Sequence, residues 1–212
     1  MQSETPAAPP YVPLATSGWP KHRMPRWLYG AFAALVVVGI AVGIAVKPTT
    51  SQRAYDMKGF LSDVTTDIES CAGGVHESLS ALHQIQAGTA ATATDVSDAI
   101  VIAQDGAQNC GPATNEQIDD LQNYQVTESL ASFKLAGVVT GLVDWADPDA
   151  VRVQTDVANL LQARGAQARS KVQAQLTKDL AVLDRQRSSI DSVVDAAIKS
   201  LQIHQSGLKL PG

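Results

Sequence analysis

In the segment 54-AYDMKGFLSDVTTDIESCAGGVHESLSALHQI-85, apolar residues recur at steps of three and four. This spacing is typical of an amphipathic α-helix, in which one face is buried. We expect one long helix from near residue 51 to near residue 87. The predicted buried stripe consists of Ala54, Met57, Leu61, Val64, Ile68, Cys71, Val75, Ser78, Leu82 and Ile85.

Helical spacing continues beyond this segment and is interrupted at Gly88, where a loop is expected. Thr94 or Asp95 is predicted to cap a second helix, which Gly111-Pro112 should end. Because no alternating run suggests a strand, the pattern predicts an all-α fold. We expect an elongated antiparallel bundle of three to five helices over residues 47–212.

The later helical regions follow the same rules. Thr114 and Gln117 have the spacing of a capping box, which predicts the start of a third helical region. From Pro148 to about Leu208 the apolar pattern remains helical, with Gly165 as the expected kink or split.

Cys71 and Cys110 are the only two cysteines. They lie at nearly equal distances from the predicted loop after Gly88, so in an antiparallel hairpin they should lie at the same height. At about 1.5 Å per residue the mismatch is a couple of ångströms. This geometry favours a structural disulfide over a metal-binding or catalytic pair, because two cysteines provide only half of a tetrahedral zinc site.

Residues 27–46, WLYGAFAALVVVGIAVGIAV, contain twenty residues without a charge. A helix of this length spans about 30 Å, which matches the hydrocarbon core of a bilayer. The segment therefore predicts a single transmembrane helix that binds the lipid bilayer.

The flanking charges predict the orientation of this helix. Lys21, Arg23 and Arg26 precede the apolar run closely, and the cations after it are more widely spaced. Under the positive-inside rule, the N-terminus is cytoplasmic and the C-terminal region is extracytoplasmic. The alternative is a cleaved signal peptide and a secreted helical protein, although the apolar run is longer than a usual signal core.

Gly39 and Gly43 form a GxxxG pair within the apolar run. Small residues at this spacing let two membrane helices approach closely, so the pair is the candidate packing site for a homodimer. Residues 1–26 precede the run and are rich in proline, without periodic apolar positions. This composition predicts a disordered cytoplasmic tail.

Charge is distributed unevenly along the chain, whose formal net charge is −5. Residues 51–150 contain 15 acidic and three basic residues, whereas residues 151–212 contain nine basic and five acidic residues. An acidic folded region argues against nucleic-acid binding.

The histidines and the clustered aspartates are the side chains best suited to metal binding or proton transfer. His76 and His83 are two helical turns apart, about 10.5 Å along the axis, which is too far for one metal ion. Asp144, Asp147 and Asp149 lack the spacing of a calcium loop and are expected to serve helix ends. No catalytic residue, metal ligand or cofactor-binding motif is predicted.

These observations favour a membrane-anchored, extracytoplasmic interaction or scaffold protein, such as an accessory subunit of an envelope complex with a protein partner. A sensor or ligand-binding helical module is the main alternative, and a pocket between the helices would favour it. An enzyme is the third hypothesis, which carboxylates meeting inside a cleft would favour.

Overall fold

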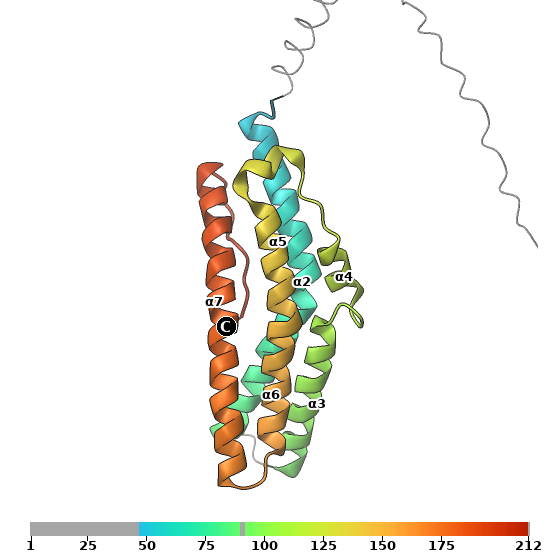
Figure 1. The fold of residues 1–212 in the computed structure, drawn as a ribbon, viewed down its shortest axis with the longest axis vertical. Helices are drawn as coiled ribbons and strands as arrows, with labels where there is room; N and C mark the ends of the chain where they lie inside the picture. Colours follow the sequence, from blue (N-terminus) through green and yellow to red (C-terminus); the bar gives the residue numbers. More distant parts are fainter. Residues whose placement is uncertain (1–46, 90–91, 212) are drawn as a thin grey trace, which may run out of the picture. The chain divides into compact units, whose positions relative to one another are not determined.

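The computed structural model describes residues 47–89 and 92–211, which are mostly helical and contain no strand (Figure 1). The all-α prediction is confirmed for this part of the chain. The elements in chain order are the α-helices α2 (Thr50–Gln86), α3 (Ala93–Cys110) and α4 (Glu116–Gln122), the 3₁₀-helix η1 (Glu128–Phe133), α5 (Leu135–Asp144), the π-helical turn η2 (Trp145–Ala150), α6 (Val151–Gln162) and α7 (Ala166–Ser200).

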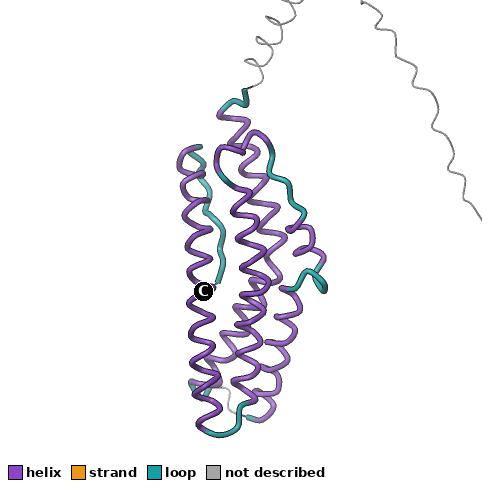
Figure 2. Tube along the Cα trace, in the orientation of Figure 1, coloured by secondary structure: helices purple, strands orange, loops and turns teal. Residues whose placement is uncertain are grey.

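The long helices run antiparallel to their neighbours in a bundle (Figure 1). Helix α2 packs mainly on α3, α3 packs on α6, and α6 packs on α7. Helices α5 and α6 follow each other along one line through η2, while α4 and η1 connect α3 to α5 on the outside. After α7, residues 201–211, hereafter the C-terminal segment, turn back along the bundle as an extended chain (Figure 2).

The expected stripe forms the buried face of α2. Met57, Leu61, Val64, Ile68 and Cys71 are buried, as are Val75, Ser78 and Leu82 further along the helix. They belong to one core that includes residues from all the helices of the bundle. The hydrophobic effect of this shared core is what makes α2 stable as a single helix of 37 residues.

Helices α2 and α3 approach closely where two glycines face each other. A Cβ atom added to Gly74 would lie 2.8 Å from the Cα of Gly106, and one added to Gly106 would overlap Oε1 of Gln154. Side chains at either position would therefore push the backbones apart. The absence of side chains here sets the distance between the two helices.

Two helices have a different N-cap residue from the one predicted. Helix α3 is capped by Thr92, whose hydroxyl accepts a hydrogen bond from the Asp95 amide while the Asp95 carboxylate accepts one from the Thr92 amide. Helix α4 is capped by Asn115, which accepts from the Gln117 amide. Thr114 instead donates to the carbonyl of Gln108 at the end of α3, so the capping box predicted from Thr114 is wrong.

The last helix ends earlier than the predicted Leu208. Gln202 has a left-handed backbone, with φ of 53°. Its amide donates to the carbonyl of Lys199, and the amide of Ile203 donates to the carbonyl of Ile198. These two hydrogen bonds form a Schellman motif, and both Ile198 and Ile203 are buried, as is usual for this motif. The predicted split at Gly165 is confirmed, because this residue precedes α7 with φ of 87°.

No helix in the ranges 47–89 and 92–211 is long and apolar enough to span a bilayer. The predicted transmembrane helix at 27–46, its Gly39–Gly43 packing site and the predicted tail at 1–26 all lie outside the described residues. These three expectations therefore stay predictions.

Gly74→Ala should lower the free energy of unfolding by about 1–2 kcal/mol, because the added methyl group separates two packed backbones. Gly73→Ala is the matched control, since nothing lies within 4 Å of its Cβ position and the residue is exposed. The control should raise stability by about 0.5–1 kcal/mol through helix propensity alone. Urea denaturation measures both values, and shifts of the same sign would contradict the proposed close packing.

Candidate functional site

The disulfide joins α2 to α3 as predicted. Cys71 and Cys110 are bonded, with their Cα atoms 4.6 Å apart, and both side chains are completely buried. The bond closes a loop with a sequence separation of 39 residues. In the chain-entropy account, such a loop destabilises the unfolded chain by about 4 kcal/mol.

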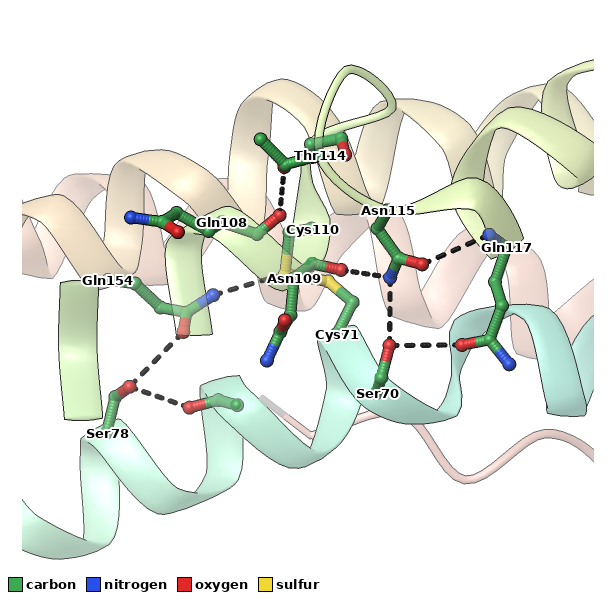
Figure 3. Close-up of a disulfide and its surroundings, with 12 residues drawn as sticks. Ser70, Cys71, Ser78, Gln108, Asn109, Cys110, Thr114, Asn115, Gln117 and Gln154 are labelled. Atoms are coloured by element: carbon green, nitrogen blue, oxygen red, sulfur yellow. Dashed lines mark hydrogen bonds between the residues drawn. A yellow bond between two sulfur atoms is a disulfide. The ribbon is translucent and has the colours of Figure 1, made fainter. Parts of the chain in front are cut away.

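A buried glutamine connects the disulfide to the glycine contact (Figure 3). The side chain of Gln154, on α6, is fully buried. Its Nε2 lies 3.1 Å from Sγ of Cys110, and its Oε1 lies 3.2 Å from the hydroxyl oxygen of Ser78. The Ser78 hydroxyl donates to the carbonyl of Gly74 at 2.6 Å, the shorter of its two contacts. One amide thus ties together α2, α3 and α6.

The buried disulfide and the residues bonded to it are suited to a structural role. Thiol–disulfide exchange needs a thiolate to reach one of the sulfur atoms, and neither cysteine is exposed. A few residues away, Asn115 donates from its side chain to Ser70, and Ser70 donates to Gln117 (Figure 3). These hydrogen bonds hold the start of α4 against α2, close to the disulfide that joins α2 to α3.

An open groove lies between α2 and the C-terminal segment. It has a volume of about 830 Å³ and is hereafter the α2 groove. Helices α2 and α7 make little direct contact, and the C-terminal segment lies between them, with Gly207 close to Asp195 and Val194 of α7. The residues that line the α2 groove include Leu61, Thr65, Ile68, Ala72, His76 and Leu208.

The α2 groove combines an apolar floor with a polar rim. Leu61, Ile68 and Leu208 are buried, whereas Glu69 and His76 are exposed at its edge. Pockets that recognise a ligand or a peptide usually have this combination of apolar walls and a few polar groups. The groove is therefore suited to binding an apolar segment or molecule.

A second, smaller cavity of about 470 Å³ lies at the other end of the bundle, hereafter the distal pocket. It is formed where α2 ends, α3 begins, α6 ends and α7 begins. Its lining consists of Leu82, Ile85, Gln86, Val96, Leu160, Leu161, Arg169, Ser170 and Gln173.

Two carboxyl groups meet between α6 and α7. Burial raises the pKa of Asp156 to about 6, and a hydrogen bond to Asp179 together with the negative charge of Asp179 acts in the same direction. Oδ2 of Asp156 is buried and has no donor among the described residues. A proton shared between the two carboxyl groups supplies that missing hydrogen bond at mildly acidic pH.

The other residues considered for chemistry do not form a site. His76 and His83 are both exposed on α2. Asp149 is buried near Arg152, at 3.6 Å, and burial raises its pKa, while Asp144 is exposed. In residues 47–89 and 92–211, no cluster of three or more histidine, cysteine or acidic side chains is arranged to hold a metal ion.

Sequence reasoning found the disulfide but missed Gln154, the glycine contact and both cavities. Gln154 follows the apolar residue Val153 directly, so helical periodicity alone does not mark it as buried. The apolar pattern predicts a helix up to about Leu208, whereas the C-terminal segment is extended and forms one wall of the α2 groove.

The chain matches no known protein family, no curated protein and no solved structure.

Stability should fall as the pH rises from about 4 to about 7, because the folded-state pKa of Asp156 lies above the ordinary value of 3.8. The stabilisation from the shared proton is complete below the unfolded-state pKa and is lost as the pH passes through the folded-state pKa. Asp156→Asn keeps a donor for Asp179 without the charge, and should flatten this dependence.

At pH 7.5 the Asp156→Asn variant should be more stable than the parent by about 1 kcal/mol or less, because solvent screens a partly exposed pair. Asp105→Asn, on the exposed surface of α3, is the charge-matched control and should leave the pH profile unchanged. Thermal melting between pH 4 and pH 8 measures both variants. An unchanged slope in Asp156→Asn would refute the shared proton.

Proposed function

We propose that the chain is a single-pass membrane protein that presents a helical binding module outside the cytoplasm and engages a protein partner there. In this proposal the bundle acts as a scaffold or accessory subunit in the envelope and performs no catalysis. The α2 groove is the observation that carries the binding role, since it leaves a space of about 830 Å³ open beside the longest helix.

The membrane anchor in this proposal rests on the sequence. Residues 27–46 are uncharged and long enough to cross a bilayer, and basic residues cluster on their N-terminal side. GxxxG pairing through Gly39 and Gly43 remains the proposed route to a homodimer.

The disulfide supports an extracytoplasmic location for the bundle. Disulfides form and persist in oxidising compartments and are rare in the cytosol. Both cysteines of the chain are used in the one bond, and it ties the two helices that carry much of the core. A fold that relies on this bond is best suited to the oxidising side of a membrane.

The groove supports partner binding because of how it is built. One wall is the extended C-terminal segment, in which residues 204–211 make no backbone–backbone hydrogen bond within the described chain. The seam between α2 and α7 thus already accepts an extended apolar chain, with Leu208 and Leu210 buried in it. A segment of a partner protein with the same character fits the open part of that seam.

Topology is tested with a reporter enzyme that is active only after its own disulfides form, fused after Gly212 through a flexible linker. The full chain should give active reporter that stays with the membrane after an alkaline wash. Deleting residues 27–46 should abolish that activity. Reporter activity restricted to the reducing interior would refute the proposed topology, and active reporter released from membranes would favour the cleaved, secreted form.

Partner binding is tested with a photo-crosslinking amino acid placed at Thr65, which lines the α2 groove. In living cells it should give a discrete adduct with another protein. Thr66 is the matched control, because it is the next residue on the same helix, is equally exposed and does not line the groove. Equal adducts at both positions, or adducts at neither, would contradict binding in the groove.

A ligand-binding module is the second candidate, and the distal pocket specifically favours it. The pocket is separate in sequence from the C-terminal segment and has its own lining from four helices. Its volume lies within the range of about 300–1,000 Å³ that small-molecule sites occupy.

A further inference from the structure

The distal pocket is divided into an apolar side and a polar side. Leu82 and Ile85 of α2, Val96 of α3, and Leu160 and Leu161 of α6 form the apolar side. The polar side is formed mainly by α7, with Arg169, Ser170 and Gln173 in its first turns. A molecule that fills this space needs an apolar body and one polar end.

Arg169 is the one charged residue among those that line the distal pocket, and the sequence around it is basic. Residues 157–178 contain Arg164, Arg169, Lys171 and Lys178 and no acidic residue, although the chain as a whole is acidic. On the opposing element, residues 78–86 of α2 contain no acidic residue either. The nearest acidic residues along α3 are Asp95 and Asp98, and Asp95 is already engaged in the capping box with Thr92.

Arg169 is available to an anion. Its Nε donates to the carbonyl of Ala163 at 3.1 Å, which holds the side chain in place beside the pocket. Among the described residues, no carboxylate lies within 4.0 Å of its guanidinium, since the only ion pairs there involve Arg152 and Arg187. An arginine fixed by one bond, with its remaining donors free, is well suited to a carboxylate.

We propose that the distal pocket binds a single-chain anionic amphiphile, a fatty acid, with its alkyl chain against Leu82, Val96 and Leu161 and its carboxylate at Arg169. Burial of methylene groups supplies most of the binding free energy. The charge of Arg169 selects an anionic head group over a neutral or cationic one. This proposal rests on the second candidate function, a ligand-binding module, and does not depend on the proposed membrane topology.

The test uses the full-length chain in amphipol and a diazirine analogue of dodecanoic acid. After photolysis, mass spectrometry should place the label mainly within residues 82–96 and 160–173. Unlabelled dodecanoate should compete, whereas dodecyltrimethylammonium, with the same chain and the opposite charge, should not.

Arg169→Glu should reduce labelling by about fivefold or more, because it replaces the attraction at the head group by repulsion. Arg185→Glu is the matched control: it makes the same charge change on an exposed position of the same helix and should leave labelling unchanged. Leu161→Trp, which fills the pocket from α6, should also prevent labelling. Circular dichroism of each variant checks that the bundle remains folded.

Four outcomes would overturn the proposal: labelling spread evenly over the bundle, labelling concentrated at the α2 groove, labelling equal in Arg169→Glu and Arg185→Glu, or no labelling of the parent chain. In the last case, a parent dimer that dissociates in Arg169→Glu would show that the pocket is instead an interface between copies. The topology reporter distinguishes failure here from failure of the proposed membrane location, because it does not depend on the pocket.

Discussion

Helices α2 and α3 pack backbone against backbone, and this contact determines where the other helices lie. Gly74 and Gly106 let the two backbones meet, and the Cys71–Cys110 bond keeps them in register a short distance away. Gln154 then fits into the space that the glycines leave and positions α6 against the pair. Because α7 packs mainly on α6 and α5, its position is determined indirectly by this contact.

This order of packing explains why the bundle contains open cavities. With α7 held by α5 and α6, the seam between α7 and α2 is left without direct helix packing. The C-terminal segment fills one part of that seam and borders the α2 groove, while the distal pocket remains at the other end. The α2 groove and the distal pocket both exist because α2 is joined to α7 mainly indirectly, through α3 and α6.

The features that sequence predicted correctly are those that depend on spacing along one helix or between two neighbouring ones. The stripe from Met57 to Leu82 follows from helical periodicity, and the cysteine pairing follows from equal distances to a loop. The turn at Gly165 follows from the conformational freedom of glycine, which the observed φ of 87° uses.

The features that were missed depend on contacts between distant segments. Gln154 is buried because two glycines on other helices leave room for it, which its own neighbours in sequence do not reveal. The end of α7 carries no glycine, so the left-handed turn at Gln202 gave no signal, and the apolar residues that follow it imitated a continuing helix. The cavities arise from the missing α2–α7 contact and have no local signature at all.

The covalent link between α2 and α3 also has a mechanical consequence. A pull applied to the two ends of the chain would pass through the sulfur bridge and bypass the intervening stretch, whose sequence separation is 39 residues. Roughly 130 Å of potential extension would stay locked, at about 3.4 Å per residue. Under tension, the loop closed by the disulfide between α2 and α3 would not extend, while α6 and α7 could be unfolded and stretched.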